Sequence, residues 1–117
     1  MTGDRLAALE AMAEAQPGEA LIWYGLANEY SKLARWDEAA RSLRRLLTID
    51  SDYTSAYQML GTALLNLGER EEARSVWTQG LAVAERTGAW KARQHMEGLL
   101  DGTRAADESG GGALCAE

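Results

Sequence analysis

The chain repeats itself with a period of 34 residues. Six apolar or small residues in the segment from Trp23 to Leu43 are each followed, 34 positions later, by another apolar or small residue. The six matched pairs are Trp23 with Tyr57, Leu26 with Leu60, Ala27 with Gly61, Tyr30 with Leu64, Ala39 with Ala73, and Leu43 with Trp77. A fixed period of this length is typical of proteins that stack one small structural unit on the next. Packing between neighbouring units is therefore expected to set the fold.

Within each copy, the apolar residues have the spacing of two helices. Leu26, Ala27 and Tyr30 fall on one face of a first helix, and Ala39 and Leu43 fall on one face of a second. Small residues beside bulky ones allow two helix backbones to approach closely while the bulky side chains fill the space next to them. Each repeat is therefore predicted to be a pair of packed helices.

The order of these residue types resembles the signature of the tetratricopeptide repeat family. The first copy reads Trp23-x2-Leu26-Ala27-x2-Tyr30 and then Ala39-x3-Leu43. The second copy fits as well, except at Leu64, where an aromatic residue is usual. The resemblance implies an all-α fold, an antiparallel helix-pair solenoid of about six helices. The chain is similar to small, bacterial-type members of the family that stand alone.

The repeat register also divides the chain into segments. We expect one tetratricopeptide-like domain over residues 1–102. Its expected parts are an N-terminal half repeat at 4–16, a first repeat at 20–53, a second repeat at 54–87 and a capping helix at 89–101. Residues 103–117 contain the run Ser109-Gly110-Gly111-Gly112 and have too few apolar groups to offset the entropy of ordering. This tail is expected to be disordered.

Composition argues against nucleic acid and membranes as partners. The chain has 12 Lys and Arg residues against 18 Asp and Glu residues, a formal net charge of −6, and the cations are scattered among the acids. Such a surface repels phosphate backbones. No run approaches the roughly 20 apolar residues that a membrane span needs. A cytoplasmic location is expected.

The residues that carry most enzyme chemistry are nearly absent. His95 is the single histidine, and Cys115, the single cysteine, lies in the glycine-rich tail, so a stable nucleophile and base pair is not expected. His95 has no second histidine, cysteine pair or spaced acidic loop to form a metal site with it. The sequence thus predicts a protein that is not an enzyme, with no catalytic residue, no cofactor and no metal.

The family resemblance places a binding surface on the first helix of each pair, which lines the concave side of the stack. Amides and hydroxyls there can satisfy the backbone of an extended peptide, and a tyrosine offers a flat apolar ring with a polar tip. The candidate peptide-binding residues are Tyr24, Asn28, Lys32, Gln58, Thr62, Asn66 and Arg93.

Some members of the family grip a terminal carboxylate with a set of Lys, Asn and Arg residues. Asn28 and Arg93 stand at two of these places, but Tyr24, Met59 and Ala89 replace the others. Missing cations weaken carboxylate recognition, so that activity is not expected. The sequence leaves two functions open. One is a protein-binding adaptor whose partner it does not identify, and the other is a structural subunit that self-associates, as a homodimer, through its end helices.

Overall fold

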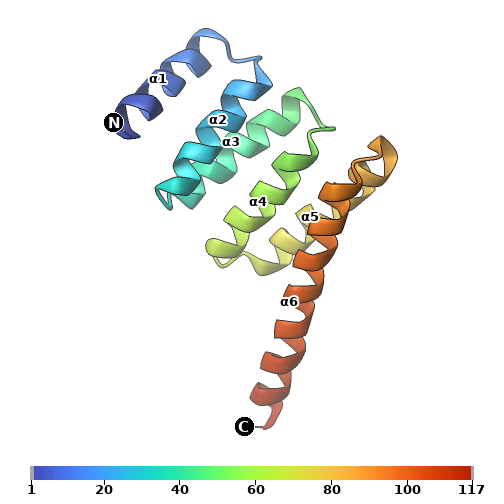
Figure 1. Ribbon diagram of the computed structural model, residues 1–117. Coiled ribbons are helices and arrows are strands. Elements are labelled where there is room, and N and C mark those ends of the chain that lie inside the picture. Colours follow the sequence, from blue (N-terminus) through green and yellow to red (C-terminus); the bar gives the residue numbers. More distant parts are fainter. Residues whose placement is uncertain (1, 117) are drawn as a thin grey trace.

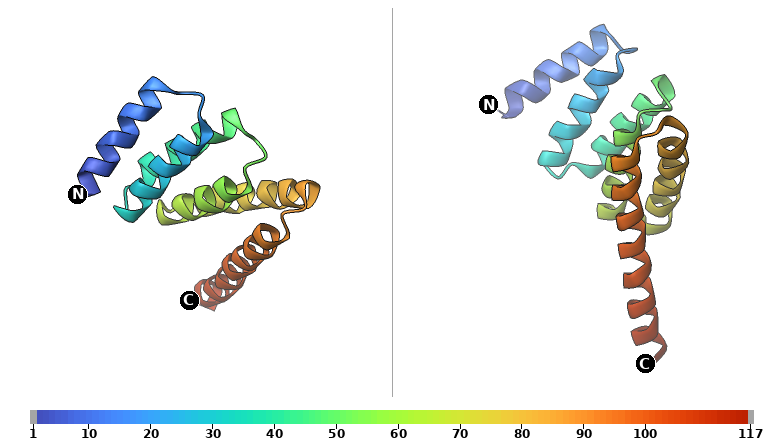
Figure 2. Two further views of the ribbon diagram at one scale, coloured as in Figure 1. Left: turned by 45° about the horizontal axis from the view of Figure 1, so that its top comes forward. Right: turned by 45° about the vertical axis from the view of Figure 1, so that its right-hand side comes forward.

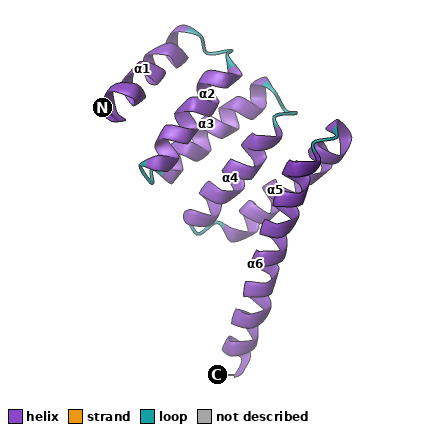
Figure 3. Cartoon of the chain, viewed as in Figure 1, coloured by secondary structure: helices purple, strands orange, loops and turns teal. Residues whose placement is uncertain are grey.

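The computed structural model describes the backbone of residues 2–116 and the side chains of residues 4–103. Over that range the chain forms six helices and no strand (Figures 1 and 3). The helices are α1 Thr2–Ala15, α2 Ala20–Lys32, α3 Trp36–Ile49, α4 Thr54–Asn66, α5 Arg70–Thr87 and α6 Trp90–Ala116. The expected all-α stack of helix pairs is confirmed.

The helices alternate between two layers. Helices α2, α4 and α6 lie on one side, and α3 and α5 lie behind them (Figures 1 and 2). Each helix packs on the next one along the chain, and α6 also reaches α4 across the stack. The first helix of every pair therefore faces the same side of the molecule, as the repeat register requires.

The tight turns after α2 and after α4 each contain a residue in the left-handed backbone conformation. Gly68 ends the turn after α4 with φ 83°, and Ala34, at the same place one repeat earlier, has φ 57°. In both turns a main-chain N–H then donates back to the preceding helix, from Arg35 to Tyr30 and from Glu69 to Leu64, at 2.8 Å each. Alanine adopts this conformation at an energetic cost that glycine avoids. The turn geometry is thus part of the repeat even where the glycine is missing.

The core consists of the residues that the 34-residue pattern pairs. Ala27, Ala39, Ala73, Leu43 and Trp77 have no exposed surface at all. Gly61 occupies the small-residue position beside Trp77, and a Cβ atom at Gly61 would overlap the indole ring. The close approach of α4 and α5 therefore depends on a residue without a side chain.

The N-terminal helix packs as a half repeat. Leu6 and Ala13 of α1 are buried against α2. The hydroxyl of Tyr30 donates to the carboxylate of Glu10 at 2.7 Å. Polar contacts thus join α1 to α2 in addition to the apolar face.

The last helix differs from the expected cap at 89–101. It begins at Trp90 and continues to Ala116, past the boundary that we placed at Gly102, so the backbone of the tail is helical where we expected disorder (Figure 1). Thr103 is buried, and Arg70 of α5 donates to its carbonyl oxygen at 2.9 Å, which ties the next turn of α6 to the domain. Disorder of residues 103–117 in solution stays a prediction.

Candidate peptide-binding groove

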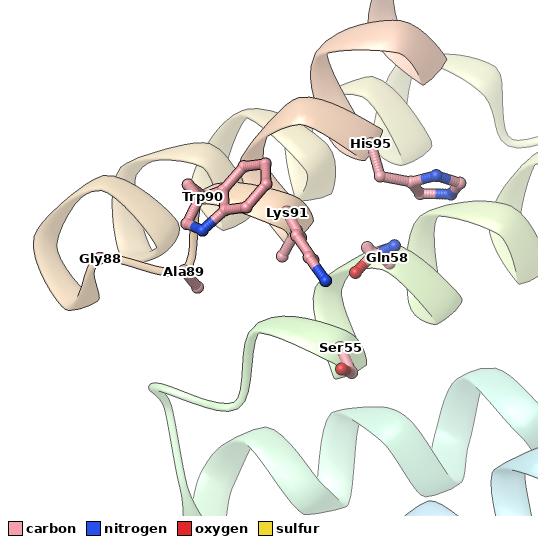
Figure 4. Close-up of a pocket in the computed structure, with 8 residues that line it drawn as sticks. Ser55, Gln58, Gly88, Ala89, Trp90, Lys91 and His95 are labelled. Carbon is pink, nitrogen blue, oxygen red and sulfur yellow. The ribbon is translucent and has the colours of Figure 1, made fainter.

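Two adjoining hollows lie along the front layer of helices. The first is lined by Tyr24, Ser31, Trp36, Ser55, Gln58, Met59, Thr62 and His95. The second is lined by Ser55, Gln58, Gly88, Ala89, Trp90, Lys91, Ala92 and His95 (Figure 4). Because Ser55, Gln58 and His95 belong to both, the hollows form one continuous depression, which we call the groove. It runs from α2 across α4 to α6.

The α2 end of the groove offers apolar and aromatic surface. Tyr24 is half-buried, and its ring centroid lies 5.4 Å from that of Tyr53 in a tilted arrangement. Burial, together with the neighbouring Tyr24 and Asp50, raises the pKa of Tyr53 above its ordinary value. Met59 lines the same hollow, and its flexible thioether adapts to irregular shapes. This end suits an apolar side chain.

The middle of the groove offers hydrogen-bonding groups that the protein itself leaves unused. The buried hydroxyl oxygen of Ser31 has no hydrogen-bond partner among the described residues. The main-chain carbonyl of Gln58 accepts hydrogen bonds from the Thr62 hydroxyl at 3.1 Å and from the Trp77 indole nitrogen at 3.2 Å. These bonds fix the backbone at Gln58, whose side-chain amide makes no hydrogen bond within the described part of the chain. A peptide main chain has the donors and acceptors to complete this set.

The structure brings together some of the residues predicted from the sequence and not others. Tyr24, Gln58 and Thr62 line the groove. Asn28 is half-buried on α2 but lines neither hollow, and exposed Asn66 donates its amide to the carbonyl of Thr62 at 2.9 Å.

The two predicted cations are engaged elsewhere. Lys32 forms an ion pair with the buried Glu29 at 3.3 Å. Arg93 pairs with Glu97 at 2.9 Å and with Glu85 at 3.6 Å, outside the groove lining. Neither residue supplies its charge to the groove.

The α6 end contains residues that the sequence prediction did not include in the site. His95 lines both hollows, and Lys91 and Trp90 line the second one. The sequence contained a signal for the position of His95, because His95 directly precedes Met96, which belongs to the apolar stripe of this helix and is buried. At about 100° per residue, Arg93 points about 160° away from His95 around the helix axis. The hollows therefore lie on the opposite face of α6 from Arg93.

In the part of the chain that the structure describes, no three or more histidine, cysteine, aspartate or glutamate side chains gather as a metal site would need. Within the same residues, no helix combines the length and the apolar character needed to cross a bilayer.

Comparisons with known proteins agree with the repeat register. Two tetratricopeptide repeat family models match residues 22–57 and 54–85. A TPR repeat-containing protein of Pseudomonas aeruginosa is 33% identical over 92 residues, which cover 79% of this chain and 88% of that protein.

Solved structures share the arrangement of helices. The solution structure of a Bordetella parapertussis protein superposes with a TM-score of 0.77 at 29% identity, covering 87% of this chain and 89% of that one. The TPR2B domain of yeast Sti1, solved as a complex with pHsp70, gives a TM-score of 0.82 at 16% identity, covering 90% of this chain and 84% of that one. The second likeness, at that identity, concerns the fold alone.

Proposed function

The chain belongs to the tetratricopeptide repeat family, a family of non-catalytic protein-interaction modules, and we propose that it binds an extended segment of a partner protein in the groove. In this role it is an adaptor whose partner is a protein or peptide. The proposal names the groove as the binding surface and Tyr24, Gln58 and Thr62 as contact residues from the predicted set.

The groove combines polar groups that make no hydrogen bond within the protein with accessible apolar surface, and this combination carries the proposal. The Ser31 hydroxyl and the Gln58 amide are without intramolecular partners in the described part of the chain, and Tyr24 and Met59 lie beside them. A buried polar group without a partner costs free energy, which a ligand's backbone can recover. The complex of the yeast Sti1 domain with pHsp70 is a property of that protein, and it supports the proposal by analogy of fold.

The groove is short. Only two complete helix pairs and the start of α6 contribute to it, so a few residues of a partner fill it. The contacts formed on binding must offset the entropy that is lost when two molecules associate and when side chains become ordered. We therefore propose modest affinity, with help from a neighbouring surface on the partner.

A capture experiment with matched variants tests the proposal. The full chain is immobilised, and partners are compared between wild type, the double variant Tyr24→Ala with Gln58→Ala, and Thr78→Ala. Thr78 is exposed on α5 and lines neither hollow, so its replacement is the control. Loss of the same captured proteins from the groove variant alone is expected. Equal capture by all three proteins contradicts groove binding.

Self-association is a second candidate function, because α1 exposes a stripe of small and apolar residues. Ala8, Ala11, Met12 and Ala15 are all exposed and follow helical spacing on a helix that has no partner before it in the described chain. Sedimentation equilibrium separates this homodimer from the adaptor. A dimer that Met12→Glu dissociates favours self-association, and a monomer at all concentrations rejects it.

The cytoplasmic location stays a prediction, which cell fractionation tests.

A further inference from the structure

The charge of the groove is opposite to that of the whole chain. The protein has a formal net charge of −6, yet neither hollow is lined by an aspartate or glutamate of the described residues. The groups that can carry positive charge there are Lys91 and His95, both at the α6 end. An acidic protein therefore presents a groove without acidic groups.

Lys91 has no carboxylate partner among the described residues. Most cations of the described residues form ion pairs with acids; examples are Arg44 with Glu72 at 2.8 Å, Arg86 with Asp52 at 2.6 Å, and Arg93 with Glu97 at 2.9 Å. The ammonium of Lys91 instead lies 5.7 Å from the centroid of the Trp90 ring, the one contact that the structure gives it. Its charge remains available to a ligand.

The position of Lys91 is unfavourable for helix stability. It lies in the first turn of α6, where the helix dipole disfavours positive charge. The first turns of α2 and α4, the equivalent helices of the front layer, carry no acid, and neither does this one. Lys91 therefore keeps a positive charge at a helix start with the Trp90 ring as its partner and no carboxylate, which makes it a candidate for a binding role.

The polar side chains around Lys91 are able to donate hydrogen bonds. Lys91 and His95 are four residues apart and so lie on one face of α6, and Ser55 and Gln58 of α4 face them across the hollow (Figure 4). The side chains of Lys91 and Gln58 extend toward the same space (Figure 4). An ammonium, an imidazole N–H, a hydroxyl and an amide together match a carboxylate, whose oxygens only accept.

The following inference rests on the proposed function. We propose that the groove selects partner segments that carry an internal aspartate or glutamate, and that Lys91 binds the carboxylate of that residue. Ser55, Gln58 and His95 supply additional hydrogen bonds, and an apolar neighbour of the acidic residue packs against Tyr24 and Met59. The hollow continues past Lys91 to Gly88 and Trp90, so the peptide chain has room on both sides of the acidic residue. A side-chain carboxylate fits this layout without requiring a chain terminus.

A displayed library of random dodecapeptides, fixed to linkers at both ends, provides the test. The library is selected on the full chain and, in parallel, on Lys91→Glu and Arg93→Glu. The two variants make the same charge change on the same helix, two residues apart, but Arg93 lies outside the groove lining. Circular dichroism confirms that both variants keep their helices. Selected peptides are then synthesised with blocked ends, together with versions in which Gln replaces Glu.

Wild type and Arg93→Glu are expected to enrich Asp and Glu, and Lys91→Glu is expected not to. A peptide selected on wild type should lose roughly three- to tenfold in affinity on Lys91→Glu and less than about twofold on Arg93→Glu. The Glu-to-Gln peptide should show a similar loss on wild type. On a further variant, Lys91→Gln, which removes the charge without reversing it, the same peptide change should cause almost no loss.

Other outcomes contradict the inference in distinguishable ways. Selected peptides that compete for the groove but show no acidic preference overturn the charge selectivity and leave groove binding intact. Peptides that bind only with a free C-terminus assign the site to a terminal carboxylate and contradict the internal residue. A selection that yields no peptide dependent on Tyr24 or Gln58 overturns both the inference and the proposed function.

Discussion

The indole nitrogen of Trp77 donates a hydrogen bond to the main-chain carbonyl of Gln58, 3.2 Å away. Trp77 is fully buried in α5, whereas the side chain of Gln58 lines the groove from α4. The core and the groove are therefore joined through one peptide unit, and changes that displace Trp77 should affect stability and, if the proposed function holds, binding as well.

Substitution at Gly61 tests the close approach of α4 and α5. A methyl group in Gly61→Ala would overlap the Trp77 indole, so we expect a loss of about 1–3 kcal/mol in the free energy of unfolding. Gly98→Ala in α6 is the matched control, because no atom lies within 4 Å of its added Cβ. That change should stabilise the helix by about 0.5–1 kcal/mol. Urea unfolding measures both, and equal stability of the two variants would show that the overlap is absent.

The 34-residue register predicted the fold better than the site. Helices α2 to α5 follow it because the same buried pairs, such as Ala39 with Ala73, recur in both repeats. Of the predicted site residues on α2 and α4, Tyr24, Gln58 and Thr62 line the groove. In α6, Met96 packs beside Gly80, and Lys91 and His95 line the groove instead of Arg93.

The 34-residue pattern also could not predict the side-chain hydrogen bonds and ion pairs that form only in the folded chain. Asn66 was predicted in the groove, but its amide bonds to the carbonyl of Thr62 one turn earlier. Lys32 was predicted there too, but it forms an ion pair with Glu29. The guanidinium of Arg5 in α1 pairs with the same carboxylate at 3.0 Å. Periodicity gives the face on which a residue lies, whereas the partner of a long side chain depends on its neighbours in space.

The Tyr30 hydroxyl contributes to the docking of α1 through its 2.7 Å bond to Glu10. Tyr30→Phe removes this bond and should lower the free energy of unfolding by about 1 kcal/mol. Tyr53→Phe is the control, since the Tyr53 hydroxyl makes no hydrogen bond within the described residues and its loss should have little effect. Thermal unfolding at pH 7 compares the two. A larger loss in Tyr53→Phe would contradict the contribution of the Glu10 contact.

Stability should also depend on pH through Tyr30. Burial and the hydrogen bond to Glu10 raise the pKa of Tyr30 from 10.0 to about 12. The folded state therefore holds the phenolic proton more tightly than the unfolded state, and this stabilisation is complete below about pH 10 and lost as the pH rises toward 12. Urea unfolding between pH 8 and 11.5 should show a steeper decline for wild type than for Tyr30→Phe. Parallel declines would contradict the raised pKa.

The buried carboxylate of Glu29 is predicted to stabilise the N-terminal helix pair. Glu29 is 2% exposed and pairs with Arg5 of α1 and Lys32 of α2, both of which are largely exposed. Because solvent screens the two cations, Glu29→Gln should cost only about 1 kcal/mol. The control Glu97→Gln breaks an exposed pair with Arg93 and should change stability by less than about 0.5 kcal/mol. Urea unfolding distinguishes them, and equal values would place Glu29 among the ordinary surface pairs.

Site-specific photo-crosslinking measures the central claim most directly. A benzophenone amino acid replaces Tyr24 in the groove in one protein and Thr78 on α5 in another, and both are irradiated with the captured partner. Groove binding predicts a crosslinked product from position 24, mapping to one short partner segment, and little or none from position 78. Crosslinking that is equal at both positions, or confined to position 78, would contradict binding in the groove.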